Sequence, residues 1–313
     1  MIVVAGEALV DLVAEDDGRF RAVPGGSPAN VAVGLARLGR PTRMLARLGA
    51  GRFGGIIREH LARNGVGLDL AVESSQPATL AVVSLDADGR AAYDFYVEGT
   101  ADWGWTPAEL PETLPAGTLA LCTGSLAVAL EPGATAITDL MRRTDAAGVS
   151  VVLDPNLRPA LLGERAAARR RLEAQVALAD VVKVSDEDLA WLAPEQSPAE
   201  TAARWLDLGP AMVVVTQGAA GAFAVTLGGA RAVVPAYPVE VLDTVGAGDA
   251  FTAGLVDALG GHDLLGGAAR GRLGRCGDAT LHDVVERATL VAALTCARRG
   301  ADPPTAAEVA AVS

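Results

Sequence analysis

The sequence contains few aromatic residues, few cysteines and few basic residues. Phe, Trp and Tyr make up 4% of the 313 residues, so Ala, Val and Leu must fill the core. The three cysteines, Cys122, Cys276 and Cys296, stand far apart without the spacing of a disulfide framework, which favours a reducing, cytoplasmic setting. With 26 Lys plus Arg against 38 Asp plus Glu, and no basic stripe, nucleic acid is not an expected partner.

Long apolar runs are also missing from the sequence. None reaches the length of a membrane span, and the N-terminus lacks the basic residues of a signal peptide, so we expect no membrane partner. Half of the residues are hydrophobic and a fifth are charged, which is the balance of a soluble globular protein.

Short apolar runs alternate with helical patterns along most of the chain. The runs lie at 1–6, 42–49, 117–124, 149–156, 179–185 and 211–218, and the helical patterns at 28–38, 53–64, 132–147, 164–178 and 199–208. Continuous apolar runs are typical of strands that are buried on both faces. The alternation predicts a single α/β domain, 1–313, with a mainly parallel sheet between layers of helices.

The segment 70–96 breaks this alternation. It contains successive strand patterns joined by turns such as "DADG" at 86–89. We expect a small antiparallel layer there. Together with 11–23 it predicts a β-sheet lid, formed by about 11–23 and 70–103, at the edge of the main sheet.

A first candidate site is the stretch "PGGSPANVAVGLARLG" near the N-terminus. Ser27 is a plausible N-cap and Pro28 a plausible first helical residue. Gly25 and Gly26 allow a ligand to approach the backbone, and the Asn30 amide offers a donor and an acceptor to a sugar hydroxyl. An ordinary junction between a loop and a helix explains these residues when they are taken alone.

A second candidate site is "DTVGAGDAF". A helix beginning around Ala247 directs free N–H groups and positive dipole character toward Gly246, Ala247 and Gly248, which predicts an anion site. Asp249 lies in the same first turn. An acid there is common for the dipole alone, but an anion site beside a base is what phosphoryl transfer to an alcohol requires.

A third stretch, "VVVTQGAAG", leads from a buried strand to Thr216, Gly218 and Gly221. The threonine hydroxyl can bind phosphate oxygens, and the glycines keep the turn low beneath a nucleotide. A plain turn between two strands explains the stretch about as well.

Two more stretches, "DPNLR" and "KVSDEDL", each follow a predicted central strand. Ligands of open parallel sheets bind beyond the carboxyl ends of the strands. Arg158 and Lys183 are therefore candidates to meet phosphate or substrate, and Glu187 or Asp188 to hold water around Mg²⁺. Capping and surface ion pairs are the competing explanation, which we prefer at Asp186.

Taken together, these stretches resemble the PfkB family of carbohydrate kinases, which have the ribokinase-like fold. The resemblance rests on "GGSPANVA" and "DTVGAGDAFTAG", two long motifs in the right order and far apart. The stretches "GSLAVALEP", "DPNLR" and "ALTCARRGADPPT" are most similar to fructokinases.

The resemblance implies a role for each matching residue. Asp249 would be the general base, with the backbone of Gly246, Ala247 and Gly248 as the anion hole. The sugar hydroxyls would be held by Asp11, Gly25, Gly26 and Asn30, with Arg158 near the substrate. ATP would lie against Thr216, Gly218 and Gly221, and a monovalent cation, K⁺, beside Asp243 and Thr244.

The implied activity is transfer of the γ-phosphate of ATP, with Mg²⁺, to a primary hydroxyl of a ketohexose such as fructose. Ribose, 2-keto-3-deoxygluconate or a nucleoside as acceptor, or a sugar or nucleotide sensor without catalysis, are the alternatives. The resemblance also implies a homodimer that pairs through the lid. Three features depart from the family pattern: its N-x-x-E motif has Ser185 and Asp188 here, no arginine follows Phe95 and Tyr96, and Gly51 stands where the family usually has an aspartate.

Overall fold

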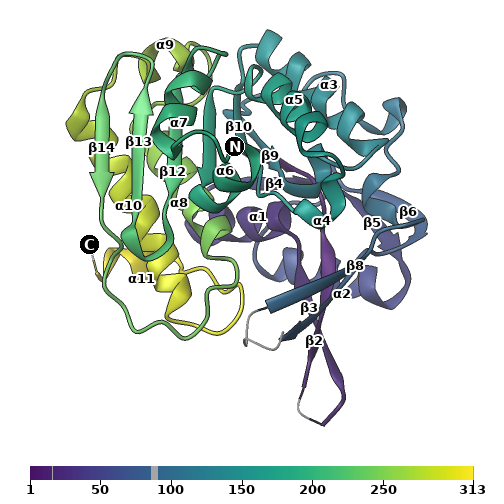
Figure 1. The fold of residues 1–313 in the computed structure, drawn as a ribbon. Helices are drawn as coiled ribbons and strands as arrows, with labels where there is room; N and C mark the ends of the chain where they lie inside the picture. The colour runs from purple at the N-terminus through teal and green to yellow at the C-terminus, as the bar shows by residue number, and fades with distance from the viewer. Residues whose placement is uncertain (16, 86–90, 313) are drawn as a thin grey trace.

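The predicted apolar runs form the centre of one large sheet (Figure 1). The computed structural model describes residues 1–15, 17–85 and 91–312, and within these the sheet has eight strands in the order β14-β13-β12-β11-β10-β9-β1-β4. Their bounds are β1 Ile2–Ala5, β4 Thr42–Leu45, β9 Ala120–Gly124, β10 Ser150–Asp154, β11 Val181–Ser185, β12 Met212–Thr216, β13 Ala222–Thr226 and β14 Arg231–Val234. The six strands β4, β1, β9, β10, β11 and β12 are parallel to one another, and β13 and β14 complete the sheet as antiparallel strands.

Both faces of the large sheet are covered by helices, because successive strand residues point to opposite faces. Ile2 and Val4 pack into one buried cluster, whereas Val3 and Ala5 pack into another. The first cluster includes residues of α1 Ser27–Arg37, α2 Gly51–Arg63, α8 Ala247–Gly261, α10 Asp278–Cys296 and α11 Ala306–Ala310. The second includes residues of α3 Gly133–Ala146, α5 Arg165–Val176, α6 Asp186–Leu192 and α7 Pro198–Leu206. This three-layer arrangement confirms the predicted fold class.

Shorter helices connect these elements. They are α4 Pro159–Leu162 and α9 Ala269–Leu273, and the 3-10 turns η1 Ala101–Trp103, η2 Pro107–Glu109, η3 Ser125–Val128 and η4 Gly218–Ala220. Among the described residues, no helix has both the length and the apolar character needed to cross a membrane.

A smaller sheet extends away from the large one at the bottom of Figure 1. It consists of β3 Phe20–Gly25, β2 Leu9–Ala14, β7 Leu80–Leu85 and β8 Ala91–Tyr96, in that order. The central pair β2 and β7 is parallel, so the layer is mixed rather than purely antiparallel as expected. The expected "DADG" turn lies outside the described residues.

The first strand pattern of the segment 70–96 lies elsewhere. Strand β6 Val72–Pro77 pairs in parallel with β5 Arg47–Ala50 in a separate two-stranded sheet. Arg47 contributes to this placement, because its guanidinium donates to Gln76 and to the carbonyl of Ala101. The function of the small sheet as a lid remains a prediction.

Candidate active site

Helix α8 begins at the carboxyl ends of the parallel strands, where ligands bind in open α/β sheets. Its N-cap, Gly246, has φ +77°, a left-handed conformation that favours glycine. The helix starts at Ala247, as the sequence predicts, so Gly246, Ala247 and Gly248 form the positive end of its dipole. This end of α8 can hold an anion.

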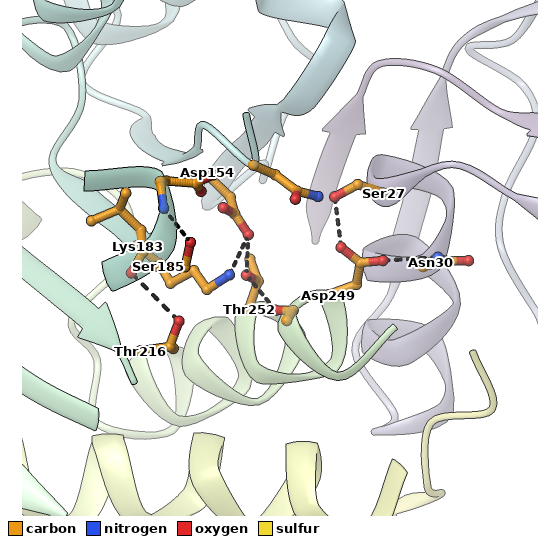
Figure 2. A network of polar contacts seen from close by, with 12 residues as sticks. Ser27, Asn30, Asp154, Lys183, Ser185, Thr216, Asp249 and Thr252 are labelled. Carbon is orange, nitrogen blue, oxygen red and sulfur yellow. Dashed lines mark hydrogen bonds and ion pairs between the residues drawn. The ribbon is translucent and has the colours of Figure 1, made fainter. Parts of the chain in front are cut away.

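Asp249 lies in the first turn of α8 with both carboxylate oxygens hydrogen-bonded (Figure 2). Ser27 Oγ donates to Oδ1 at 2.6 Å, and Asn30 Nδ2 donates to Oδ2 at 2.8 Å. Burial raises the pKa of Asp249, while these two hydrogen bonds oppose the rise. The carboxylate is thus oriented, largely removed from water, and more basic than an exposed aspartate.

Helix α1 supplies both partners of Asp249, and one prediction about it is wrong. The N-cap of α1 is Gly26, with φ +99°, and Ser27 is the first helical residue. A Cβ at Gly26 would lie 2.9 Å from the carbonyl oxygen of Glu7, which is too close for a side chain at this position. Because glycine takes the cap position, the Ser27 hydroxyl is released to bind Asp249.

A polar pocket of about 300 Å³ opens on one side of Asp249. Asp11, Gly26, Asn30 and Arg158 line it, as predicted for a sugar site, together with Phe95 of β8. Burial, and then the charge of Asp249, raise the pKa of Asp11 to about 6, and Arg158 acts in the opposite direction.

The backbone of Gly25 lies directly against the Asp11 carboxylate. A Cβ at Gly25 would lie 2.2 Å from Asp11 Oδ2, so only glycine leaves that side chain in place. Among the aromatic residues of the predicted lid segment 70–103, Phe95 lines the polar pocket, whereas Tyr96 and Trp103 do not. Tyr96 is 61% exposed, and Trp103 is buried away from solvent.

A larger pocket of about 610 Å³ opens on the other side of the α8 N-terminus. Its lining includes every residue that the sequence analysis assigned to ATP, namely Lys183, Thr216, Gly218 and Gly221. Side chains of Tyr237, Val239 and Val241 also line it. Such a mixture of flat apolar surface and small polar groups suits a nucleotide.

The two pockets meet at the start of α8. Gly248, Thr244 and Asn156 line both of them, Gly246 lines the polar pocket, and Ala247 lines the larger one. Asp249 faces the polar pocket at this junction. A group that passes from the larger pocket to the polar one must therefore pass the anion site beside an oriented carboxylate.

Comparisons with known proteins agree with this geometry. The model of the pfkB family carbohydrate kinases matches residues 1–307. The chain belongs to the PfkB family of carbohydrate kinases. Fructokinase of Klebsiella pneumoniae is 37% identical over 263 residues, which are 83% of this chain and 85% of the relative. The resemblance stated from the sequence is confirmed.

Solved structures of fructokinases have the same fold. The Xylella fastidiosa fructokinase with bound ATP superposes with a TM-score of 0.89 at 31% identity, covering 99% of this chain and 97% of that one. The Vibrio cholerae O395 fructokinase bound to fructose, ADP and calcium ion has a TM-score of 0.85 at 30% identity, covering 99% and 98%. This PfkB protein is accordingly a carbohydrate kinase, a phosphotransferase.

The acidic residues predicted to hold a divalent cation lie beside the larger pocket. Glu187 is exposed and Asp188 is partly buried, and both line the larger pocket. Burial, and then the neighbouring Asp154, raise the pKa of Asp188 to about 6. A cation in the pocket would relieve that unfavourable negative charge, so these residues fit a water-mediated Mg²⁺.

Asp243 and Thr244, predicted to adjoin a monovalent cation, precede α8. The Asp243 carboxylate accepts hydrogen bonds from the backbone N–H of Val245 at 3.0 Å and of Gly300 at 2.7 Å. It thereby ties the loop before the anion site to the segment after α10. Thr244 lines both pockets.

Sequence reasoning missed Glu7, which lines the polar pocket and is 1% exposed. Its Oε2 accepts a hydrogen bond from the backbone N–H of Ala127 at 3.2 Å. Burial raises its pKa to about 7, opposed by a hydrogen bond from Ser125, and Asp102 raises it further. Glu7 follows the first parallel strand, so the rule that ligands bind at carboxyl ends of strands was the available signal.

Replacing Glu7 by Gln is expected to stabilise the kinase more at neutral pH than in acid. The pKa of Glu7 is about 7 in the folded chain, against 4.5 for a glutamate in water. Between these values the folded state binds more protons, so stability falls as the pH rises. Urea denaturation should show that the gain from E7Q is about 2–3 kcal/mol larger at about pH 7.5 than at about pH 5. An equal gain at both pH values would contradict the raised pKa.

Proposed function

We propose that this PfkB protein is an ATP-dependent kinase that phosphorylates a primary hydroxyl of fructose. The observation that carries the proposal is the position of Asp249 at the junction of two pockets, one polar and sugar-sized, the other suited to a nucleotide. Fructokinases from several bacteria share the fold and more than 30% of the sequence, which supports a ketohexose as the acceptor.

In this mechanism Asp249 accepts the proton of the sugar hydroxyl as its oxygen attacks the γ-phosphorus. The new O–P bond forms while the bond from that phosphorus to the bridging oxygen of ADP breaks, and ADP leaves. In this proposal the N–H groups of Gly246 and Gly248, at the start of α8, face the charge that develops on the phosphoryl oxygens. The N–H of Ala247 between them donates to the carbonyl oxygen of Thr244 at 3.2 Å. Ser27 and Asn30 hold the base in position.

The sugar hydroxyls contact Asp11, Asn30 and the backbone of Gly25 and Gly26. Arg158 provides a cationic side chain on this pocket, although no arginine follows Tyr96. Phe95 lines the pocket from the small sheet, so movement of that sheet would cover the sugar and exclude water.

Thr216, Gly218, Gly221 and Lys183 contact the nucleotide. Mg²⁺, held through water by Glu187 and Asp188, would neutralise charge on the phosphates. A monovalent cation such as K⁺ beside Asp243 and Thr244 would support the loop before the anion site.

The lid sheets are also proposed to pair in a homodimer. Phe20 on β3 and Tyr96 on β8, the two edge strands of the small sheet, are 55% and 61% exposed. Burial of such residues favours association. Light scattering of the purified protein should give the mass of a dimer, and a monomer at working concentrations would contradict this part of the proposal.

The function is tested by measuring ADP release with fructose, ribose, 2-keto-3-deoxygluconate and a nucleoside, with Mg²⁺ and with or without K⁺. We expect the highest kcat/KM with fructose, and NMR of the product to show phosphate on a primary hydroxyl. A higher kcat/KM with another acceptor would overturn fructose but leave the kinase. Sugar binding without ADP release would instead indicate a sensor.

A further inference from the structure

Lys183 is the only lysine in the sequence, which otherwise uses arginine, 25 times, for its long cationic side chains. It ends in one of the least accessible parts of the molecule, since only 4% of the residue is exposed. Buried lysines are rare and need a partner. Both the choice of lysine and its burial therefore need an explanation at this position.

The partner of Lys183 is Asp154, at the end of the neighbouring parallel strand. The register of β10 and β11 pairs Leu153 with Val182, so the two next residues emerge side by side. Lys183 Nζ donates to Asp154 Oδ2 at 2.9 Å, and Asp154 is 5% exposed (Figure 2). The strand ends thus hold a buried ion pair beneath the nucleotide pocket.

Helix α8 completes this arrangement. The hydroxyl of Thr252 donates to the same Asp154 Oδ2 at 2.9 Å and also lies 3.0 Å from the carbonyl oxygen of Gly248. A Cβ at Gly248 would lie 3.2 Å from Lys183 Nζ, and Lys183 and Gly248 line the same pocket. The ammonium group consequently lies against the anion site at the start of α8.

We propose that Asp154 is a positioning residue of the phosphoryl transfer, which with Thr252 holds the ammonium of Lys183 beneath the first turn of α8 to meet the phosphate being transferred. The inference rests on the proposed function and adds a role for Asp154 and Thr252, to which the sequence analysis assigned none. Asp154 holds Lys183 through Oδ2 alone, and among the described residues its buried Oδ1 has no hydrogen-bond partner.

The geometry also explains why lysine is retained. An ammonium is a compact point charge with three donors, so it can hold Asp154 and still direct a proton toward an anion. A planar guanidinium is larger than the ammonium, which already lies 3.2 Å from the position that a Cβ at Gly248 would take, and its donors form a fixed fork. Lys183→Arg should therefore lose turnover even though it preserves the charge.

The pair also influences the base. Asp154 raises the pKa of Asp249 and Lys183 lowers it. Asp11 on β2 is a further charged group near Asp249, and none of these substitutions changes it. Removing only the lysine charge should raise the pKa of Asp249, and removing only the aspartate charge should lower it. The acid limb of the pH–rate profile should shift upward in Lys183→Met and downward in Asp154→Asn.

The experiment compares K183M, K183R, D154N and T252V with the double variant D154N/K183M. We expect kcat to fall by about 10²-fold in K183M and by about tenfold in D154N, with the KM for fructose within about threefold of the wild type. The double variant removes both buried charges, so it should fold even if a single variant does not. It should remain as slow as K183M, with the acid limb near its wild-type position.

Asp257→Asn is the matched control. Asp257 is a buried aspartate on the same helix that pairs with Arg40 and Arg287, far along α8 from the site. It should lower stability without changing kcat. If the double variant regains wild-type turnover, the pair is structural only and the proposal is overturned.

A binding measurement makes the test independent of the acceptor sugar. Calorimetry should show that K183M binds ADP about as well as the wild type but binds the β,γ-imido analogue of ATP about tenfold more weakly. Equal weakening of both nucleotides would contradict contact with the transferred phosphate. Absence of sugar phosphorylation in the wild type would refute the proposed function but leave this result interpretable.

Discussion

Asp249→Asn is expected to lower kcat by about 10²- to 10⁴-fold, the usual contribution of a general base. Asparagine has the same shape, and Ser27 can turn its hydroxyl to accept from the new amide while Asn30 still donates to the remaining oxygen. The pocket therefore keeps its geometry and loses only the group that takes the proton. Steady-state kinetics with the preferred sugar measure the loss of turnover, and calorimetric titration of ADP measures whether the pocket still binds the nucleotide.

Stability provides a second readout for the same substitution. Burial raises the pKa of Asp249, which means that the folded chain holds its carboxylate at a cost. A neutral amide removes that cost, so the variant should unfold at the same or a higher urea concentration at neutral pH. An inactive variant that is also much less stable would point to misfolding instead of loss of the base. Near-normal turnover would refute the role of Asp249 as the general base.

Much of the fold was predictable because its signals are local. Continuous apolar runs predicted the parallel strands β1, β4, β9, β10, β11 and β12, and periodic patterns predicted the helices between them. Strand β6 was expected in the small sheet because its own residues say nothing about its partner. The pairing with β5 depends on contacts of Arg47 with distant residues, which no local pattern reports.

The site was predictable where one stretch carries both geometry and chemistry. In "GAGDAF" the glycines, the helix start and the acid are consecutive, so a local argument could predict an anion site and a candidate base there, and the structure places the helix start at Ala247 as predicted. Asp154 and Lys183 come from β10 and β11 and are brought together by the parallel register of these strands, while the packing of α8 adds Thr252. Ser27 was assigned to the wrong task because its real partner, Asp249, is 222 residues away in the chain.

Gly246→Ala is expected to lower kcat by about 10²- to 10³-fold, because it disturbs the donors of the anion site. The added Cβ would lie 2.5 Å from the Cβ of Ala301 and 2.9 Å from its Cα, distances that real atoms do not tolerate. Backbone at Ala301 cannot move aside as a flexible side chain would. The start of α8 must therefore shift, and its N–H groups would no longer point at the transferred phosphate.

Gly65→Ala separates this effect from the ordinary cost of a left-handed residue. Gly65 follows α2 with φ +78°, close to the φ of +77° at Gly246, but a Cβ there would meet nothing within 4 Å. It should lose about 1–2 kcal/mol of stability and keep its kcat. The measurements are steady-state kinetics and urea denaturation of both variants. Equal kcat values would mean that the anion site tolerates the shift. A loss of kcat confined to Gly246→Ala would locate the transition-state donors in the first turn of α8.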